Sequence, residues 1–254
     1  MKKLSLITVF LAACLAAQLA SAQTVTLNKA EKLVPQGWTV ADDDLKFKKD
    51  TQALLNDDGE VISGILNSDT YLRPTGWQSI INDYCYVQAS SVFFPRFFRP
   101  VGVRYGIAIP TYGHVRYKSG SLVHFAKDGT VLSGTIDEKT TVALQKDRYG
   151  FVDFKADTVL TFDAEGHIIS GTLADDTRLR PLGWQQNRTN AANAGFLEFK
   201  GSRTITFDTD GYVTGGTVKE AASWKNADGE IITLPAKANV RFTADGAEII
   251  DSKK

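Results

Sequence analysis

The side chains best suited to binding lie in one segment, residues 84–127, which contains no acidic residue. Four phenylalanines stand beside two arginines there: Phe93, Phe94, Arg96, Phe97, Phe98 and Arg99. If exposed, this aromatic and basic cluster would meet an anionic surface polymer or lipid headgroups, because sizeable exposed apolar patches mark interaction sites. The alternative is that the rings fill a core, since contiguous aromatics in soluble domains are usually buried.

Tryptophans offer a second binding chemistry, because a flat indole ring can stack on a sugar ring. Trp77 and Trp184 are the candidates, with Trp38 and Trp224 as further members of the set. The alternative interpretation is that these rings pack turns against the core, with the indole N–H meeting a hydrogen-bond partner. The sequence leaves both roles open.

Catalytic and metal-binding patterns find little support. The histidines have no ligand spacing, and the stretches 163–166 and 208–211 resemble only the opening of a calcium loop. Cys85 has no oriented base nearby in sequence, and neither a nucleophile elbow, a phosphate loop nor a dinucleotide fingerprint occurs. The sequence therefore predicts no metal site, no cofactor and no enzyme activity, with an enzyme of unrecognised type as the least favoured class.

The N-terminus predicts export. Lys2 and Lys3 precede an apolar run from Leu4 to Ala17, and small residues follow at Ala20 and Ala22. We therefore predict a helical signal peptide over residues 1–22 and a periplasmic or extracellular protein without a transmembrane span. A competing interpretation is a lipobox at residues 11–14, which would leave the mature chain lipid-anchored through Cys14.

Charge and cysteine content limit the possible partners of the chain and the sources of its stability. Without residues 1–22 the chain keeps 27 basic and 29 acidic side chains, so its net charge is about −2 and favours no nucleic-acid partner. Cys85 would then be the one remaining cysteine, so no intramolecular disulfide can form. Stability must come from packing and strand pairing.

A repeated hairpin is the element that must position all of these residues. Each copy has apolar residues six and four positions before an acid-Gly turn, and aliphatic residues after it. The turn glycines are Gly59, Gly129, Gly166, Gly211 and Gly246. The alternation predicts strands and the glycine permits the positive φ of a tight reversal. The predicted fold is all-β, an array of antiparallel hairpins forming a meander or solenoid-like sheet.

The returning strand of each hairpin carries apolar residues two and seven positions after the turn glycine, which a regular strand would place on opposite faces. One extra residue must be absorbed between them. We predict a β-bulge at the intervening glycines, Gly64, Gly134, Gly171 and Gly216. Alternatively, both faces of the hairpins are covered.

The spacing of the turn glycines predicts how the chain is divided into repeats. The turn glycines lie 70, 37, 45 and 35 residues apart, so the first interval has room for a degenerate unit between residues 84 and 110. A second motif, Pro-x-Gly-Trp, recurs at residues 35–38, 74–77 and 181–184 and predicts a turn. We predict a lead-in over residues 23–44 and a repeat domain over 45–254 with a divergent unit at 84–127.

The hairpin pattern, clearest from Phe207 to Gly216, resembles two families of short bacterial β-hairpin repeats: the variant MORN-type repeat and the choline- or glucan-binding repeat of cell-wall proteins. The resemblance implies a non-catalytic binding or scaffold role. Ligand residues are not carried over, because Thr135, Thr172 and Thr217 stand where cell-wall repeats place an aromatic. The expected function is a structural or protein-interaction repeat of the bacterial cell envelope, or else a module that binds a glycan or an anionic surface polymer.

Overall fold

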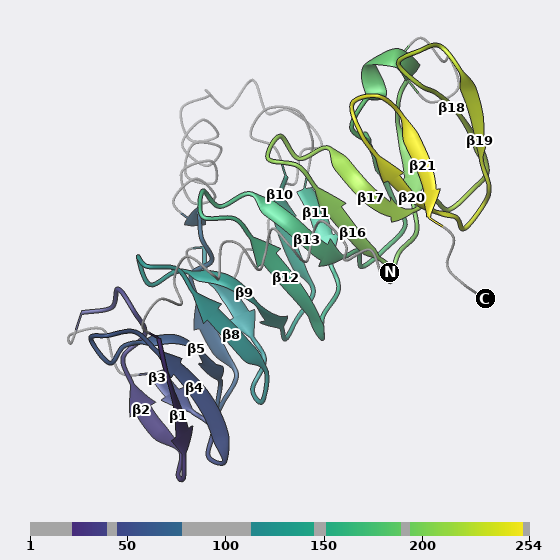
Figure 1. The fold of residues 1–254 in the computed structure, drawn as a ribbon. Helices are drawn as coiled ribbons and strands as arrows, with labels where there is room; N and C mark the ends of the chain where they lie inside the picture. Colours follow the sequence, from purple (N-terminus) through teal and green to yellow (C-terminus); the bar gives the residue numbers. More distant parts are fainter. Residues whose placement is uncertain (1–21, 40–44, 78–112, 145–150, 189–193, 251–254) are drawn as a thin grey trace, which may run out of the picture.

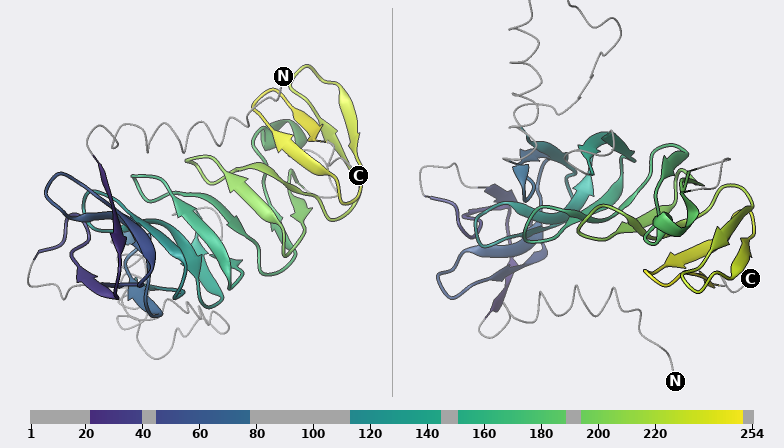
Figure 2. Two further views of the ribbon diagram at one scale, coloured as in Figure 1. Left: turned by 60° about the horizontal axis from the view of Figure 1, so that its bottom comes forward. Right: turned by 90° about the horizontal axis from the view of Figure 1, so that it is seen from above.

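The structure, a computed structural model, describes residues 22–39, 45–77, 113–144, 151–188 and 194–250. These residues form strands and one short 3₁₀ helix, so the predicted all-β class and antiparallel meander are confirmed. The hairpins follow one another along an elongated array from β1 to β21, as Figure 1 and the two views of Figure 2 show. The predicted signal helix lies outside the described residues.

One 13-stranded sheet forms the body of the array, and eleven of its strands follow one another in chain order. They are β1 (Gln23–Leu27), β4 (Thr51–Leu55), β5 (Val61–Ile65), β8 (Leu122–Phe125), β9 (Val131–Ile136), β12 (Thr158–Phe162), β13 (Ile168–Thr172), β16 (Thr204–Phe207), β17 (Val213–Thr217), β20 (Asn239–Phe242) and β21 (Ala247–Ile250). The strand pairs along this path are antiparallel, so each repeat adds one hairpin to the sheet.

Shorter strands form five two-stranded ribbons, of which four are separate sheets and one is joined to the large sheet by the pairing of Tyr117 with Ile136. The pairs are β2 (Glu31–Leu33) with β3 (Leu45–Phe47), β6 (Thr70–Leu72) with β7 (Val115–Tyr117), β10 (Thr140–Ala143) with β11 (Phe151–Phe154), β14 (Thr177–Leu179) with β15 (Leu197–Phe199), and β18 (Ala222–Lys225) with β19 (Ile231–Leu234). The 3₁₀ helix η1 (Trp184–Asn187) follows β14. The buried core lies between these ribbons and one side of the sheet, because buried residues such as Phe47, Val123 and Leu160 come from both.

The predicted hairpin turns are confirmed in four repeats. Gly59, Gly129, Gly166 and Gly211 have φ values between +76° and +95°, which glycine adopts without strain. Each of these turns is closed by the same backbone bond, for example from Asn56 N–H to the Glu60 carbonyl at 2.8 Å. The last hairpin differs, because β20 and β21 pair without a register shift.

The predicted β-bulge exists in these four hairpins, but its predicted position is wrong. The register shifts between the first and third residues of the returning strand, so the unmatched residues are Ile62, Leu132, Ile169 and Thr214. Beside the bulge, Val61 N–H donates to the Val34 carbonyl at 2.8 Å and Gln36 N–H donates to the Val61 carbonyl at 3.0 Å. The distorted strand thereby joins the Pro-x-Gly-Trp segment to the sheet.

The repeated glycines have another role, which is to admit an aromatic ring. A Cβ on Gly64 would lie 2.7 Å from Cδ1 of Phe47 in ribbon strand β3, closer than carbon atoms can approach. The equivalent pairs are Gly134 with Tyr117, Gly171 with Phe154, and Gly216 with Phe199. Each ring therefore packs directly on the sheet backbone, which a glycine inside a strand permits.

β5 and β8 are neighbours in the large sheet, although the expected degenerate hairpin between residues 84 and 110 stands between them in the sequence. β5 pairs directly with β8, with Ser63 opposite His124, so the backbone edge of β5 is already occupied. Residues 78–112 fall outside the described residues. The segment 23–44 contributes β1, which pairs with β4 at the edge of the large sheet, and β2.

Tyr117 provides a test of ring packing in the core. Its side chain is fully buried, and its hydroxyl has no hydrogen-bond partner within the part of the chain that the structure describes. The other repeats place phenylalanine there, as in Phe47 and Phe154. Because an unsatisfied buried hydroxyl costs about 1–3 kcal/mol, Tyr117→Phe should raise the free energy of unfolding by about that amount.

Urea denaturation followed by circular dichroism measures this change. The reciprocal variant, Phe154→Tyr, adds a hydroxyl at the equivalent position and should destabilise the protein. Equal stability of both variants and the wild type would show that the Tyr117 hydroxyl is satisfied in solution.

Candidate interaction surface

The aromatic and basic cluster predicted from the sequence, Phe93 to Arg99, lies outside the described residues, as do Cys14 and Cys85. The described binding candidates are Trp77 and Trp184, both half-buried. They come from different turns of the array, after β6 and β14 respectively. The structure therefore does not bring them together into one site.

An arginine covers one face of each of these indole rings. The guanidinium carbon of Arg73 lies 4.0 Å from the ring centroid of Trp77, and that of Arg180 lies 3.9 Å from the ring of Trp184. Trp184 also lies against Tyr212, with ring centroids 6.4 Å apart. This stacking is a cation–π contact between residues of the same Arg-Pro-x-Gly-Trp motif. It leaves less indole surface for a sugar ring.

The Pro-x-Gly-Trp turns have a structural role between repeats. Trp38 Nε1–H donates to the Gly129 carbonyl at 2.8 Å, and Gln36 Nε2 donates to the Phe125 carbonyl at 2.7 Å. A Cβ on Gly76 would lie 2.8 Å from Cα of Gly166. Each turn therefore packs closely against the hairpin turn of a later repeat, and Trp38 and Trp184 also contact the core.

The side of the large sheet away from the ribbons carries a continuous row of residues. Register pairings link, in order, Thr24, Leu54, Ser63, His124, Ser133, Thr161, Ser170, Thr206, Gly215, Arg241 and Glu248. These positions alternate along each strand with core residues such as Ala53, Val123 and Ile205. Since side chains alternate across a strand, the row lies opposite the core.

A second row of residues runs beside the first. Each of its members lies two positions from a first-row residue on the same strand. Its pairs are Thr26 with Gln52, Ile65 with Leu122, Thr135 with Val159, Thr172 with Thr204, and Thr217 with Asn239. The bulge residues lie on the same side, because the hydroxyls of Thr206 and Thr214 are 2.9 Å apart. We call the two rows and the bulge residues, from β1 to β17, the outer face.

The outer face carries no Asp, Glu, Lys or Arg among these described positions. It combines small hydroxyl side chains with aliphatic ones, and its one titratable group is His124. Exposure within it is uneven: Ile62, Ser63, Thr161 and Thr217 are buried, whereas Leu122 and Val159 are 46% and 54% exposed. Charge returns at the C-terminal end of the first row, with Arg241 and Glu248.

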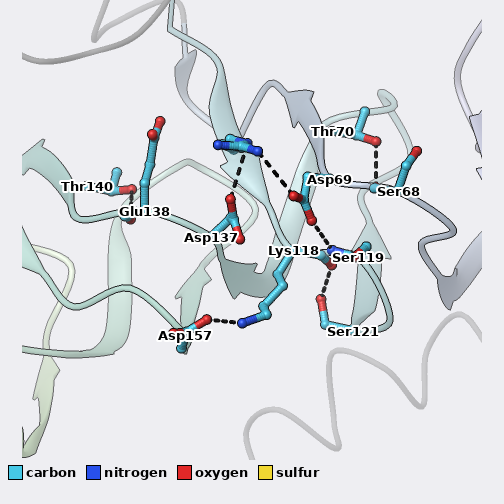
Figure 3. A network of polar contacts seen from close by, with 11 residues as sticks. Ser68, Asp69, Thr70, Lys118, Ser119, Ser121, Asp137, Glu138, Thr140 and Asp157 are labelled. Atoms are coloured by element: carbon cyan, nitrogen blue, oxygen red, sulfur yellow. Dashed lines mark hydrogen bonds and ion pairs between the residues drawn. The ribbon is translucent and has the colours of Figure 1, made fainter.

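Charged side chains gather instead on the turns and short strands, as Figure 3 shows for one part of the array. Arg116 lies between two carboxylates, 3.1 Å from Asp69 and 3.2 Å from Asp137. Asp69 also accepts the Ser119 N–H at 2.8 Å, and this bond is the main reason that its pKa is lowered. Lys118 pairs with Asp157 of the next repeat.

The same arrangement recurs further along the chain. Lys139 lies 2.7 Å from Asp153 and 3.7 Å from Asp175. Lys219 lies 3.1 Å from Asp176 and 3.0 Å from Glu198. Each cation is thus shared by two carboxylates, and such exposed networks link neighbouring repeats with modest energy. The described turns and short strands therefore carry paired positive and negative side chains, whereas the described outer face carries no charged residue.

His124 occupies the first row of the outer face, with Ser63 and Ser133 as its register partners. Burial lowers its pKa below the ordinary value of 6.5, because the charged imidazolium is poorly solvated there. The unfolded chain therefore takes up a proton more readily than the folded chain as the pH falls below about 6.5. Folding stability should consequently decrease with falling pH until the folded-state pKa is passed.

His124→Thr tests this expectation, since threonine occupies the equivalent positions Thr161 and Thr206. Urea midpoints measured at pH 7.5 and pH 5.5 should differ less for the variant than for the wild type, because the variant lacks the titrating group. An identical pH dependence of the two proteins would show that His124 is not the responsible group.

One group of possible metal ligands occurs at a hairpin turn. Asp163, Glu165 and His167 place their ligand atoms within 4.8 Å of one another. The turn itself explains their proximity: Asp163 accepts backbone bonds from Glu165 and His167, and its second oxygen lies 2.8 Å from His167 Nδ1. The sequence prediction that the protein binds no metal stays a prediction.

The outer face was not foreseen from the sequence. Its signal is the absence of charge at alternate strand positions, which becomes readable only once the register across each bulge is known. Comparisons with protein-family models, curated proteins and solved structures found no match. Among the described residues, no helix is long and apolar enough to cross a membrane.

Proposed function

We propose that this chain is a non-catalytic, exported repeat protein of the bacterial cell envelope that acts by protein interaction. Its binding surface is the outer face of the large sheet. The described ribbons pack on the other side of the sheet, where they form the core with it. Catalysis plays no part in this proposal.

The lack of charge on the outer face is the observation that carries the proposal. An antiparallel sheet with one open side usually alternates apolar inward residues with polar outward ones. Charged residues make up 23% of this chain, yet none occupies the outer face among the described residues. Exposed aliphatic side chains such as Leu122 and Val159 there resemble the surfaces that proteins use for association.

The other expected partners fit this surface less well. An anionic polymer or lipid headgroup needs cations, and the described outer face offers none. A glycan platform normally uses exposed aromatic rings, whereas Arg73 and Arg180 cover one side of Trp77 and Trp184. Protein association needs only apolar surface with hydrogen-bonding groups of matched shape.

Charged substitutions on the outer face test the proposal. In extracts of expressing cells made with a mild non-ionic detergent, the wild type should migrate on native gels as an assembly larger than its monomer. The double variant Leu122→Glu, Val159→Glu should lose this assembly, because burying two unpaired charges opposes association. The detergent releases the protein from membrane even if Cys14 carries a lipid.

Ile231→Glu is the matched control. Ile231 is 68% exposed and aliphatic, but it belongs to ribbon strand β19 and not to the outer face. This variant should keep the large assembly. Identical migration of the wild type and both variants would contradict the proposal, provided that thermal unfolding followed by circular dichroism shows all three folded.

A further inference from the structure

We infer that the partner of the outer face is a second copy of this chain, packed sheet against sheet about a two-fold axis. The inference rests on the function proposed above and specifies the partner. Three properties of the outer face support it: its lack of charge, its repeated small side chains and its area.

The lack of charge makes the outer face compatible with itself. Interfaces between different proteins commonly use complementary charge to select the partner, and like charges across an interface cost several kcal/mol. Two identical charged faces would need an arrangement that avoids this repulsion. Two outer faces can meet without burying any unpaired Asp, Glu, Lys or Arg of the described strands.

The small side chains let two sheets approach closely. The returning strands β5, β9 and β13 contribute Ser63, Ser133 and Ser170 to the same row, each followed by a glycine. Face-to-face sheets pack at about 10 Å when the facing side chains interdigitate. Larger aliphatic residues beside the serines, including Leu122 and Val159, would supply the interdigitating contacts and the apolar surface that association removes from water.

The area of sheet that carries the face is comparable with that of a small dimer interface. Eight adjacent strands, from β4 to β17 in the sheet order, carry the face apart from its edge strand β1. At about 4.8 Å between strands and about 16 Å along each strand, they cover roughly 600 Å² per copy, or about 1,200 Å² in total. Specific interfaces bury about 1,200–2,000 Å², so this face reaches the lower end of that range.

A two-fold arrangement also closes the assembly. Each copy presents the same surface to the other, so the interface is isologous and both outer faces become covered. The strand edges at β1 and β21 take no part in it, which leaves the ends of the array unchanged. The expected species is therefore a dimer and not a fibre.

Sedimentation velocity of the purified protein over a range of micromolar concentrations tests the inference. The wild type should show twice the mass of the chain, and high salt should not dissociate it, because screening acts on charges. Leu122→Glu with Val159→Glu should weaken dimerisation on the order of a hundredfold or more. Leu122→Thr with Val159→Thr, a substitution suited to exposed strands, should weaken it less. Ile231→Glu should dimerise like the wild type.

Two results would overturn the inference: a wild type that stays monomeric at every concentration, or a charged double variant that dimerises as tightly as the wild type. Should the purified wild type be monomeric while the charged variant still loses its assembly in cell extracts, the partner is a different protein. The proposed function would then stand and the self-association would fall. If purified dimers form through this face but extracts show no difference between variants, the proposed function falls instead.

Discussion

Replacing Phe154 by alanine is expected to lower the free energy of unfolding by about 3–5 kcal/mol, the usual range for a buried phenylalanine. Phe154 is fully buried in ribbon strand β11, and its ring lies where a Cβ on Gly171 would be only 2.5 Å away. The ring also meets Phe207 edge-on at a centroid distance of 6.5 Å. Removing it therefore opens a cavity between the ribbon and the large sheet.

Urea denaturation followed by circular dichroism measures this loss. Ile231→Ala is the matched control, because Ile231 is an exposed aliphatic residue of ribbon strand β19 outside the outer face, so its stability cost should stay below about 1 kcal/mol. A Phe154→Ala variant as stable as this control would contradict the proposed packing of ribbons on the sheet.

Gly76→Ala should lower the free energy of unfolding by about 2–5 kcal/mol. A left-handed backbone costs an alanine about 1–2 kcal/mol, and overpacking costs about 1–3 kcal/mol more. Gly76 has a φ of +77°, and an added Cβ would meet the backbone of Gly166 in the hairpin turn of a later repeat. Backbone atoms cannot yield as a flexible side chain can. The Pro-x-Gly-Trp turn would have to move away from the repeat that it contacts.

Gly59→Ala separates the cost of the left-handed backbone from the cost of the contact between turns. Gly59 has nearly the same φ, +79°, but no atom lies within 4 Å of the position that an added Cβ would occupy. Its alanine variant should therefore show only the backbone cost of about 1–2 kcal/mol. Equal losses for Gly59→Ala and Gly76→Ala, measured by the same urea denaturation, would show that the contact between turns contributes nothing.

Much of the fold could be predicted from the sequence because the hairpin signal is local. The acid-Gly turns at Gly59, Gly129, Gly166 and Gly211 carry alternating apolar residues on both sides, and both features act within about a dozen residues. A bulge is needed because Val61 and Leu66 are separated by an odd number of positions, which a regular strand would place on opposite faces. These inferences use strand alternation alone, which the chain satisfies in each repeat.

The position of the bulge could not be predicted, because a glycine in a strand has two physical explanations. Gly64, Gly134, Gly171 and Gly216 fit a bulge, but they are needed for contact with rings from the ribbons. Those rings lie on strands as short as Leu45–Phe47, which show too little alternation to be recognised. The signal that was missed is an aromatic residue recurring six positions before the first core residue of the first four hairpins, as Phe154 precedes Leu160.

The candidate surface was harder to predict than the fold. The sequence directs attention to chemically conspicuous residues such as Phe93 and Arg96, whereas the outer face consists of serine, threonine and aliphatic residues that are unremarkable singly. Their common feature emerges only when the register places Ser63 opposite His124 and Thr161 opposite Ser133. Long-range strand pairing sets this register, and local sequence patterns do not encode the pairing.

Site-specific photo-cross-linking in living cells tests the central claim most directly, because it reports contacts of the outer face without altering its charge. A photoreactive amino acid at Val159, on the outer face, should yield a cross-linked protein product, whereas the same amino acid at Ile231, more exposed but on ribbon strand β19, should yield little. A product of twice the mass of the chain would identify a second copy. Cross-linking from Ile231 equal to that from Val159, or none from Val159, would contradict the claim that the outer face is the interaction surface.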